Sequence, residues 1–322
     1  MSNSDVIAVV QKLAKPLYSM VRVAGPFLLS QSKTALENYS DYKLNKARLE
    51  ALSILLQEEA KNISTDRAKL RAQIINSSGL ERVKAQNDYD LLTKELNKLS
   101  TIDKVKDFIS DDDEIDKDSY ISDSWIEQFN NLASSLNEEW RKTLLAKAFA
   151  LELKKSGSIT IVVLNAIASF DELSFKKFGI LINASIRFKD INLFPCVAFN
   201  DEMTININNE ERNLIAVAYE LKHLSLIEMK AGYINSGSDI VYFRYGRRVL
   251  QLKYPDNDIK EFYVIHAYFL TSLGNKIASL YEREITPLGE YMFKNLCEEA
   301  KKKGCTYKEI LISDELYRDL GN

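Results

Sequence analysis

Residues 226–254 read LIEMKAGYINSGSDIVYFRYGRRVLQLKY, and this stretch decides how the C-terminal part of the chain is built. Apolar, β-branched and aromatic residues at 226–234 and 240–245 predict two strands, because such residues favour extended backbone. The intervening 235–238 is rich in turn formers and predicts a tight connection. Residues 249–254 and 264–270 predict further strands.

Helices are predicted on both sides of these strands, over 209–222 before them and over 271–282 and 288–302 after them. This order resembles a winged helix-turn-helix unit. Thr271 opens the first of the later helices, and Thr286 is expected to cap a helix that begins at Pro287.

The hairpin also carries concentrated positive charge, with tyrosines interleaved. Arginines on a wing can contact the phosphate backbone of nucleic acid, where charge neutralisation gives affinity without sequence preference. The alternatives are a strand edge guarded by charge and a protein-docking wing, and nearby acidic residues dilute the local field. The predicted nucleic-acid contacts are Arg244, Arg247, Arg248 and Lys253.

The preceding residues are dominated by helical periodicity, which gives a mainly α fold with a small β component. Four segments follow: a long-helix arm or hairpin at 1–109, an acidic linker at 110–119, a central helical core at 120–200, and the winged-helix-like module at 201–322. The acidic run at 110–118 fits a solvated linker. A metal loop is the alternative, but the run lacks the central glycine of a calcium loop.

The N-terminal arm opens with an amphipathic helix whose polar face carries Lys12, Lys15 and Arg22. Such a face could contact an anionic membrane surface, or the helix could pack on its own protein or a second copy. Residues 31–100 predict long charged helices with a turn at 76–79. Their apolar seams fit a hairpin within one chain or a bundle between chains.

The central core is predicted from four helices, at 125–136, 137–155, 158–170 and 171–186. Ser158 and Asp171 are suitable N-cap residues, and Gly157 suits the end of the helix before Ser158. Large side chains at helical spacing usually face a core. The predicted packing residues are Trp125, Phe129, Trp140, Leu144 and Leu145.

Composition excludes several classes of protein. The 322 residues carry 43 Lys+Arg against 46 Asp+Glu, so a generally basic nucleic-acid coat is excluded. Three widely spaced cysteines, Cys196, Cys297 and Cys305, fit reduced thiols in a cytoplasmic protein without structural zinc. No signal peptide or membrane-spanning run is expected, because lysines interrupt the apolar N-terminus and the uncharged runs are short.

Motifs for catalysis are scarce. His223 and His266 are the only histidines, neither lies in a nucleophile motif, and no Gly-rich phosphate loop occurs. Asp239 followed by Gln251 and Lys253 is a remote match to a metal-dependent nuclease, which needs carboxylates for the metal and a lysine at the reacting phosphate. Only one carboxylate is in place, so we expect no enzyme, metal or cofactor.

Residues 125–164 carry a family resemblance. They read WIEQF at 125–129, NEE at 137–139, LAKAFALE at 145–152 and GSIT at 157–160, with Leu164 beyond. This resembles the domain-of-unknown-function 2806 family of bacterial proteins. The resemblance implies no activity or ligand, and some relatives lie near bacterial antiphage systems. Glu152 and the Gly157-Ser158 pair are expected to determine the local fold.

The sequence therefore predicts a non-enzymatic interaction or regulatory protein that acts as a homo-oligomer or with a protein partner, and the family resemblance suggests a role in phage defence. The alternative is a DNA-binding regulator that uses the hairpin from Arg244 to Lys253.

Overall fold

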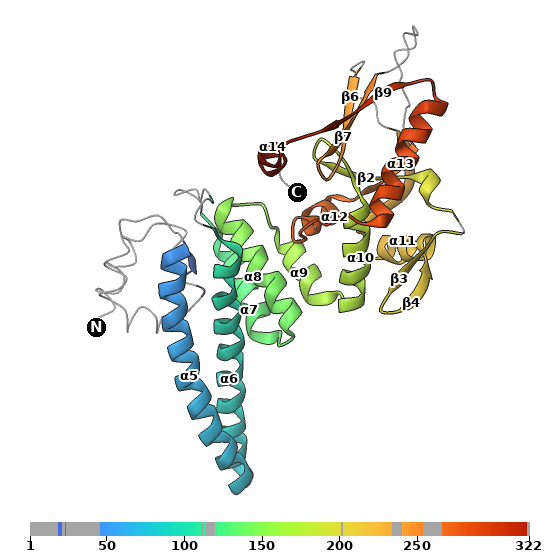
Figure 1. The fold of residues 1–322 in the computed structure, drawn as a ribbon. Coiled ribbons are helices and arrows are strands. Elements are labelled where there is room, and N and C mark those ends of the chain that lie inside the picture. The colour runs from blue at the N-terminus through green and yellow to red at the C-terminus, as the bar shows by residue number, and fades with distance from the viewer. Residues whose placement is uncertain are drawn as a thin grey trace. The chain divides into compact units, whose positions relative to one another are not determined.

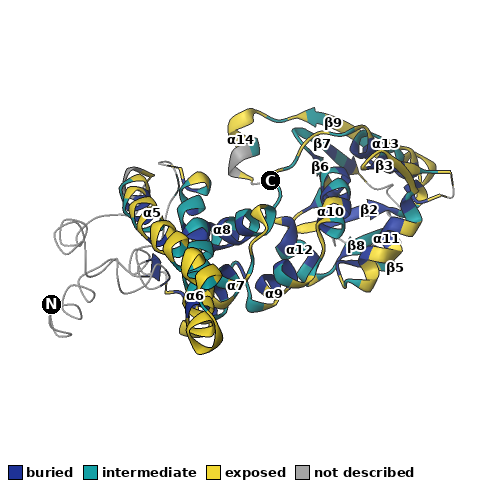
Figure 2. Ribbon diagram, turned by 90° about the horizontal axis from the view of Figure 1, so that it is seen from below, coloured by how far each residue is buried: buried dark blue, intermediate teal, exposed yellow. Residues whose placement is uncertain are grey.

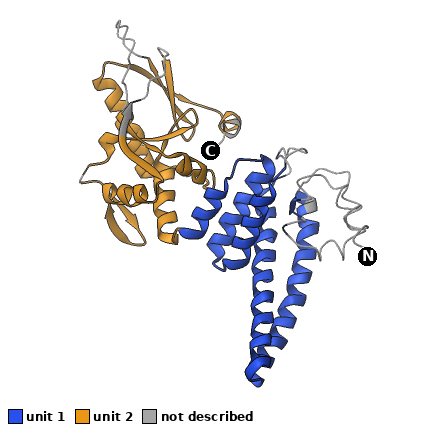
Figure 3. Cartoon of the chain, turned by 180° about the vertical axis from the view of Figure 1, so that it is seen from behind, with its two compact units in different colours: residues 1–169 blue, residues 170–322 orange. Residues whose placement is uncertain are grey.

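The chain forms two compact units, residues 1–169 and residues 170–322, which Figure 3 colours separately. The described residues are mostly helical, with one antiparallel seven-stranded sheet and one separate pair of strands. The predicted mainly α fold with a β component is confirmed. The computed structural model describes residues 19, 20, 23, 46–110, 113, 120–200, 202–233, 240–253 and 266–320.

Two long antiparallel helices, α5 (Lys46–Asn76) and α6 (Gly79–Asp103), form a hairpin in the first unit (Figure 1). They meet at the predicted turn, where Gly79 has a φ of 57° that glycine adopts easily. Buried leucines concentrate away from this turn, at Leu49, Leu52 and Leu99. Toward the turn many residues are exposed (Figure 2), because two helices alone cannot cover their own apolar surface.

Several sequence predictions for this half fall outside the described residues. They are the basic helix face of Lys12, Lys15 and Arg22 and most of the acidic linker, namely 111, 112 and 114–119. Among the residues that are described, no helix is both long enough and apolar enough to cross a lipid bilayer.

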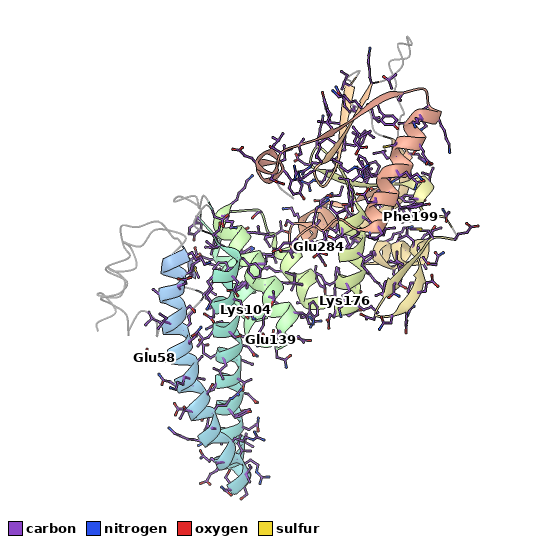
Figure 4. The ribbon with its side chains drawn as sticks, in the orientation of Figure 1. Glu58, Lys104, Glu139, Lys176, Phe199 and Glu284 are labelled. Atoms are coloured by element: carbon purple, nitrogen blue, oxygen red, sulfur yellow. The ribbon has the colours of Figure 1, made fainter. Side chains whose placement is uncertain are left out.

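The base of the hairpin is joined to a three-helix core. A short 3₁₀ helix, η1 (Lys104–Phe108), follows α6, and the core helices are α7 (Asp123–Ser135), α8 (Glu139–Lys154) and α9 (Ile161–Ser169). Nζ of Lys104 lies 3.2 Å from a carboxylate oxygen of Glu139, and Figure 4 labels both residues.

Aromatic packing holds the three core helices together. The rings of Trp125 and Phe129 stack with centroids 5.4 Å apart, and Phe149 lies 4.9 Å from Phe129. Nε1 of Trp125 donates to the carbonyl of Ile159 at 2.8 Å, which satisfies the one polar atom of a buried indole. Trp125, Phe129 and Leu145 are buried as predicted, and Trp140 and Leu144 are half-buried.

Glu152 organises the loop between α8 and α9. Its side chain is 3% exposed, and its two carboxylate oxygens accept from the backbone N–H groups of Gly157 at 2.6 Å and Ile159 at 2.8 Å. The sequence predicted that Ser158 caps α9, and this prediction is wrong. The Ser158 hydroxyl instead donates to the carbonyls of Leu151 and Lys155 at the end of α8, because the chain needs two more residues to turn before α9 begins.

The second unit is built on a sheet with strand order β5-β8-β2-β1-β6-β7-β9, in which all neighbours are antiparallel. The predicted strands are confirmed as β5 (Ile227–Tyr233), β6 (Ile240–Tyr245), β7 (Arg248–Lys253) and β8 (His266–Leu270). The predicted turn at 235–238 lies outside the described residues.

Three strands of this sheet were not predicted: β1 (Ile186–Phe188), β2 (Ile191–Pro195) and β9 (Thr306–Leu311). β1 and β2 lie in the middle of the sheet, where the sequence predicted the end of a helical core. They are too short for an alternating pattern to stand out. The predicted helix over 209–222 also begins later than expected, because β3 (Thr204–Ile207) pairs with β4 (Glu210–Asn213).

Helices surround this sheet. They are α10 (Glu172–Ala184), α11 (Leu214–His223), α12 (Ser272–Ala278), α13 (Pro287–Lys302) and α14 (Asp314–Asp319). The caps predicted at Asp171 and Thr286 are confirmed, and Thr271 caps α12 in the same way, since each accepts from a backbone N–H three residues later. α13 packs against β2, β1 and β6.

We predict that Glu152→Ala lowers the free energy of unfolding of the first unit by about 2–4 kcal/mol, because it leaves the N–H groups of Gly157 and of the buried Ile159 without their charged acceptor. Both tryptophans lie in this unit, so tryptophan fluorescence during urea unfolding is the measurement. Glu127→Ala, at an exposed position on α7, is the control and should change the value by less than about 0.5 kcal/mol. Equal effects of the two variants would contradict the role of Glu152.

Candidate anion-binding site

Two arginines face each other across neighbouring strands of the second unit. Arg187 on β1 and Arg244 on β6 are direct register partners, so their side chains leave the same face of the sheet about 5 Å apart at Cβ. Both side chains are half-buried. Like charges directly opposite each other destabilise a strand pair, so this arrangement is a cost that packing alone does not explain.

A third arginine lies beside this pair. Arg283, in the connection between α12 and α13, donates to Oγ of Ser185 at 3.0 Å and to Oδ1 of Asn192. Asn192 is itself the register partner of Arg187 on β2 and is 1% exposed. Its Nδ2 donates to Oδ1 of Asn275 at 2.7 Å. This buried polar network fixes Arg283 next to Arg187.

The connection that carries Arg283 is held at both ends. Before it, the hydroxyl of Tyr281 donates to the carbonyl of Phe175 at 2.9 Å. After it, the hydroxyl of Tyr245 accepts from N of Thr286 at 2.8 Å and donates to the carbonyl of Thr286 at 3.2 Å. A Cβ on Gly289 would lie 1.9 Å from this hydroxyl oxygen, so glycine is needed for β6 and α13 to approach this closely.

The charges of the three arginines act on one another. Burial, followed by the charges of Arg187 and Arg244, lowers the pKa of Arg283 to about 10. Burial also lowers the pKa of Arg187, and the charge of Asp190 opposes this effect. The pKa of Arg244 is lowered by burial and then by the charge of Arg187. All three guanidinium groups remain protonated near neutral pH.

Arg187 contributes an unsatisfied hydrogen-bond donor to this cluster. Within the described part of the chain, the buried Nε of Arg187 has no hydrogen-bond partner. A buried donor without an acceptor costs about 1–3 kcal/mol, and such groups in folded proteins often mark a site for a water or an ion.

The C-terminal segment covers part of the cluster. The ring centroid of Tyr317, on α14, lies 5.4 Å from Cζ of Arg244. α14 is held to the sheet by Arg247, whose Nε donates to the carbonyl of Ile312 at 3.0 Å and whose Nη1 lies 2.8 Å from a carboxylate oxygen of Asp314. The chain therefore returns to the β6–β7 hairpin after β9 (Figure 1).

A cavity of about 480 Å³ opens beside Arg187 and Arg244, within the range of small-molecule sites. Three cations and one carboxylate line it, which gives an excess of positive charge. Arg283 lines a separate, smaller cavity of about 220 Å³. There Glu284, labelled in Figure 4, and Asp314 balance Arg247 and Arg283. The charged lining of the larger cavity is Arg187, Lys189, Asp190 and Arg244.

The turn between β1 and β2 supplies two of these charges. Phe188 pairs with Ile191, so Lys189 and Asp190 are the two residues of a tight hairpin turn. Lys189 has a φ of 51°, which costs a residue with a side chain about 1 kcal/mol relative to glycine. Neither residue is buried. The turn therefore accepts strain while holding an ammonium and a carboxylate at the cavity.

The four predicted nucleic-acid contacts do not form one patch. Arg244 belongs to the arginine cluster, and Arg247 is paired with Asp314. Arg248 points to the other face of the sheet, where it pairs with Glu309 and Glu290 and lies over the ring of Phe293. The hydrogen bonds that Arg248 donates to Glu309 and to Glu290 raise its pKa against the effect of burial.

Lys253 lies at the opposite end of β7, where it pairs with Ile240. Val249 is the partner of Arg244, so Lys253 is four residues, or about 13 Å, further along the strand.

The remote nuclease arrangement is only partly described. Asp239 lies outside the described residues, and Nε2 of Gln251 donates to Oη of Tyr242 at 3.3 Å. Over the ranges that the structure describes, histidine, cysteine and acidic side chains form no group of three or more suited to a metal ion.

Sequence reasoning did not identify Arg187, Lys189, Arg283 or Tyr317. Arg187, Arg244 and Arg283 are spread over about a hundred residues, and only the strand register brings the first two together. The available signal was a single charge between two buried apolar residues, in Ile186-Arg187-Phe188.

Comparison of the chain with family models, with curated proteins and with solved structures finds no match in any of the three. Its relation to the domain-of-unknown-function 2806 family stays a prediction from the sequence.

We predict that Arg187→Met raises the stability of the second unit by about 0.5–1 kcal/mol, because it removes a charge opposed by Arg244 and leaves no buried donor unsatisfied. Hydrogen–deuterium exchange of peptides from β1 and β6 measures this as slower exchange.

Arg248→Met is the matched control on the same sheet. It should speed exchange in β7 and β9, because Glu290 and Glu309 lose their partner. The cost is about 1 kcal/mol, since these carboxylates are partly exposed. Faster exchange in the Arg187 variant would show that Arg187 is a structural residue.

Proposed function

We propose that this chain is a non-enzymatic binding protein whose second unit holds a phosphate-bearing anion at Arg187 and Arg244. The observation that carries the proposal is the direct pairing of these two arginines across β1 and β6. An anion between them would turn a repulsive pair into a chelating one, because guanidinium groups form strong charge-assisted bonds to phosphate oxygens.

The surroundings favour an anion over a structural explanation. Arg283 adds positive field and is fixed by Ser185 and Asn192, so it need not move when a ligand binds. The unsatisfied Nε of Arg187 offers a donor. Arg187 and Arg244 both line the cavity, so a ligand can reach them from solvent. Donors that are already held in position raise affinity, because fewer side chains have to be ordered on binding.

Other expectations from the sequence stay predictions. DNA binding through a winged-helix-like hairpin gains less support, because Arg247 and Arg248 are paired with carboxylates. Assembly through the long helices, a protein partner, a role in phage defence and a cytoplasmic location are untested expectations, and a regulatory role would follow if anion binding changes such an assembly.

Isothermal titration of the full chain with inorganic pyrophosphate tests the proposal. We expect saturable binding that weakens as salt is added, because the interaction is electrostatic. Arg187→Met and Arg244→Met should each weaken it at least about ten-fold, the loss of one charge-assisted hydrogen bond.

Arg212→Met is the control for net charge. Arg212 lies on β4 and pairs with Glu210, and it does not line the cavity. The affinity of the Arg212→Met variant for pyrophosphate should therefore stay within about two-fold of the parent value. No binding by the parent chain, or equal losses in all three variants, would overturn the proposal.

A further inference from the structure

The cavity beside the arginine pair is larger and more varied than a phosphate requires. A bare phosphate or pyrophosphate would fill only part of the roughly 480 Å³. Apolar or aromatic residues on the same face as Arg244 also line it and include Ile240, Tyr242 and Val249. Ligand sites of this size usually combine an apolar wall with a few polar groups that fix orientation.

The aromatic part of the wall is next to the arginines. Tyr242 lies two residues before Arg244 on β6 and therefore on the same face of the sheet, about 7 Å away along the strand. Tyr242 is 52% exposed, which leaves a ring available for stacking. Its hydroxyl accepts from Nε2 of Gln251, which restrains the ring.

A carboxylate also lines the cavity. Asp190 opposes a ligand that consists of phosphate alone, because its charge repels the anion and offsets part of the field of Arg187. It suits a ligand with hydrogen-bond donors at some distance from its phosphates, since a carboxylate accepts strongly from hydroxyl and amino groups.

We infer that the ligand is a nucleoside phosphate. Its phosphates lie between Arg187 and Arg244, its base stacks on Tyr242, and Asp190 accepts from a sugar hydroxyl or a base amino group. This inference rests on the proposed phosphate-binding function and adds the class of ligand. A base has a π face whichever base it is, so stacking by itself gives affinity with little preference among bases.

The test compares pyrophosphate with the four common ribonucleoside diphosphates, by isothermal titration of the full chain. At least one diphosphate should bind about ten-fold more tightly than pyrophosphate, because stacking and the contact to Asp190 are added. Tyr242→Ala should remove at least about five-fold of the nucleotide affinity and leave the pyrophosphate affinity unchanged, whereas Tyr242→Phe, which keeps the ring, should retain it.

Tyr219→Ala is the matched control. Tyr219 is 48% exposed on α11 and does not line the cavity, so this variant should bind nucleotides as the parent does. The inference is overturned, with the proposed function intact, if pyrophosphate binds through Arg187 but nucleotides bind no better, or if Tyr242→Ala loses no nucleotide affinity. Absence of binding by pyrophosphate and by every nucleotide would overturn both.

Discussion

The second unit depends on one electrostatic constraint: two guanidinium groups lie opposite each other on β1 and β6 and are partly shielded from water. Water would screen such a pair almost completely, but burial strengthens the repulsion. The pair persists because the strands that carry it are fixed elsewhere. Phe188 and Phe243 stack on the opposite face of the same strands, with ring centroids 5.2 Å apart.

Arg283 is likewise a partly buried charge that is held in place by contacts with its surroundings. Its guanidinium, Ser185 and Asn192 hydrogen-bond to one another. Three residues later, the backbone of Thr286 is held by the hydroxyl of Tyr245, whose side chain leaves the other face of the sheet. A partly satisfied network would be worse than an apolar core. The buried Nε of Arg187 lacks a hydrogen-bond partner, and Arg187 lines the larger cavity together with Arg244.

Local sequence signals predicted much of the fold and little of the site. Cap residues such as Thr271 and Thr286 act on N–H groups three residues away, so their effect can be read from neighbours. The hairpin of β6 and β7 was predicted for the same reason. β1 and β2 were not, because strands of three and five residues take their identity from the strands beside them.

Neighbouring arginines in the sequence meet different environments. Strand alternation sends Arg244 to one face and Arg248, after the turn, to the other, where two carboxylates neutralise it. The sequence prediction grouped Arg244 with Arg248 because they are close in the chain, although their side chains lie on opposite faces of the sheet. It omitted Arg187 and Arg283, which the folded sheet places near Arg244. Arg187 and Arg244 repel each other across β1 and β6, so the free protein carries a cost that a bound anion would reduce. Anything that binds the folded chain and not the unfolded one stabilises it, and here the gain would include relief of the repulsion between Arg187 and Arg244. Ligand affinity and folding stability are therefore coupled at this sheet. The two arginines whose repulsion lowers the stability of the second unit without a ligand are the residues that would bind the anion.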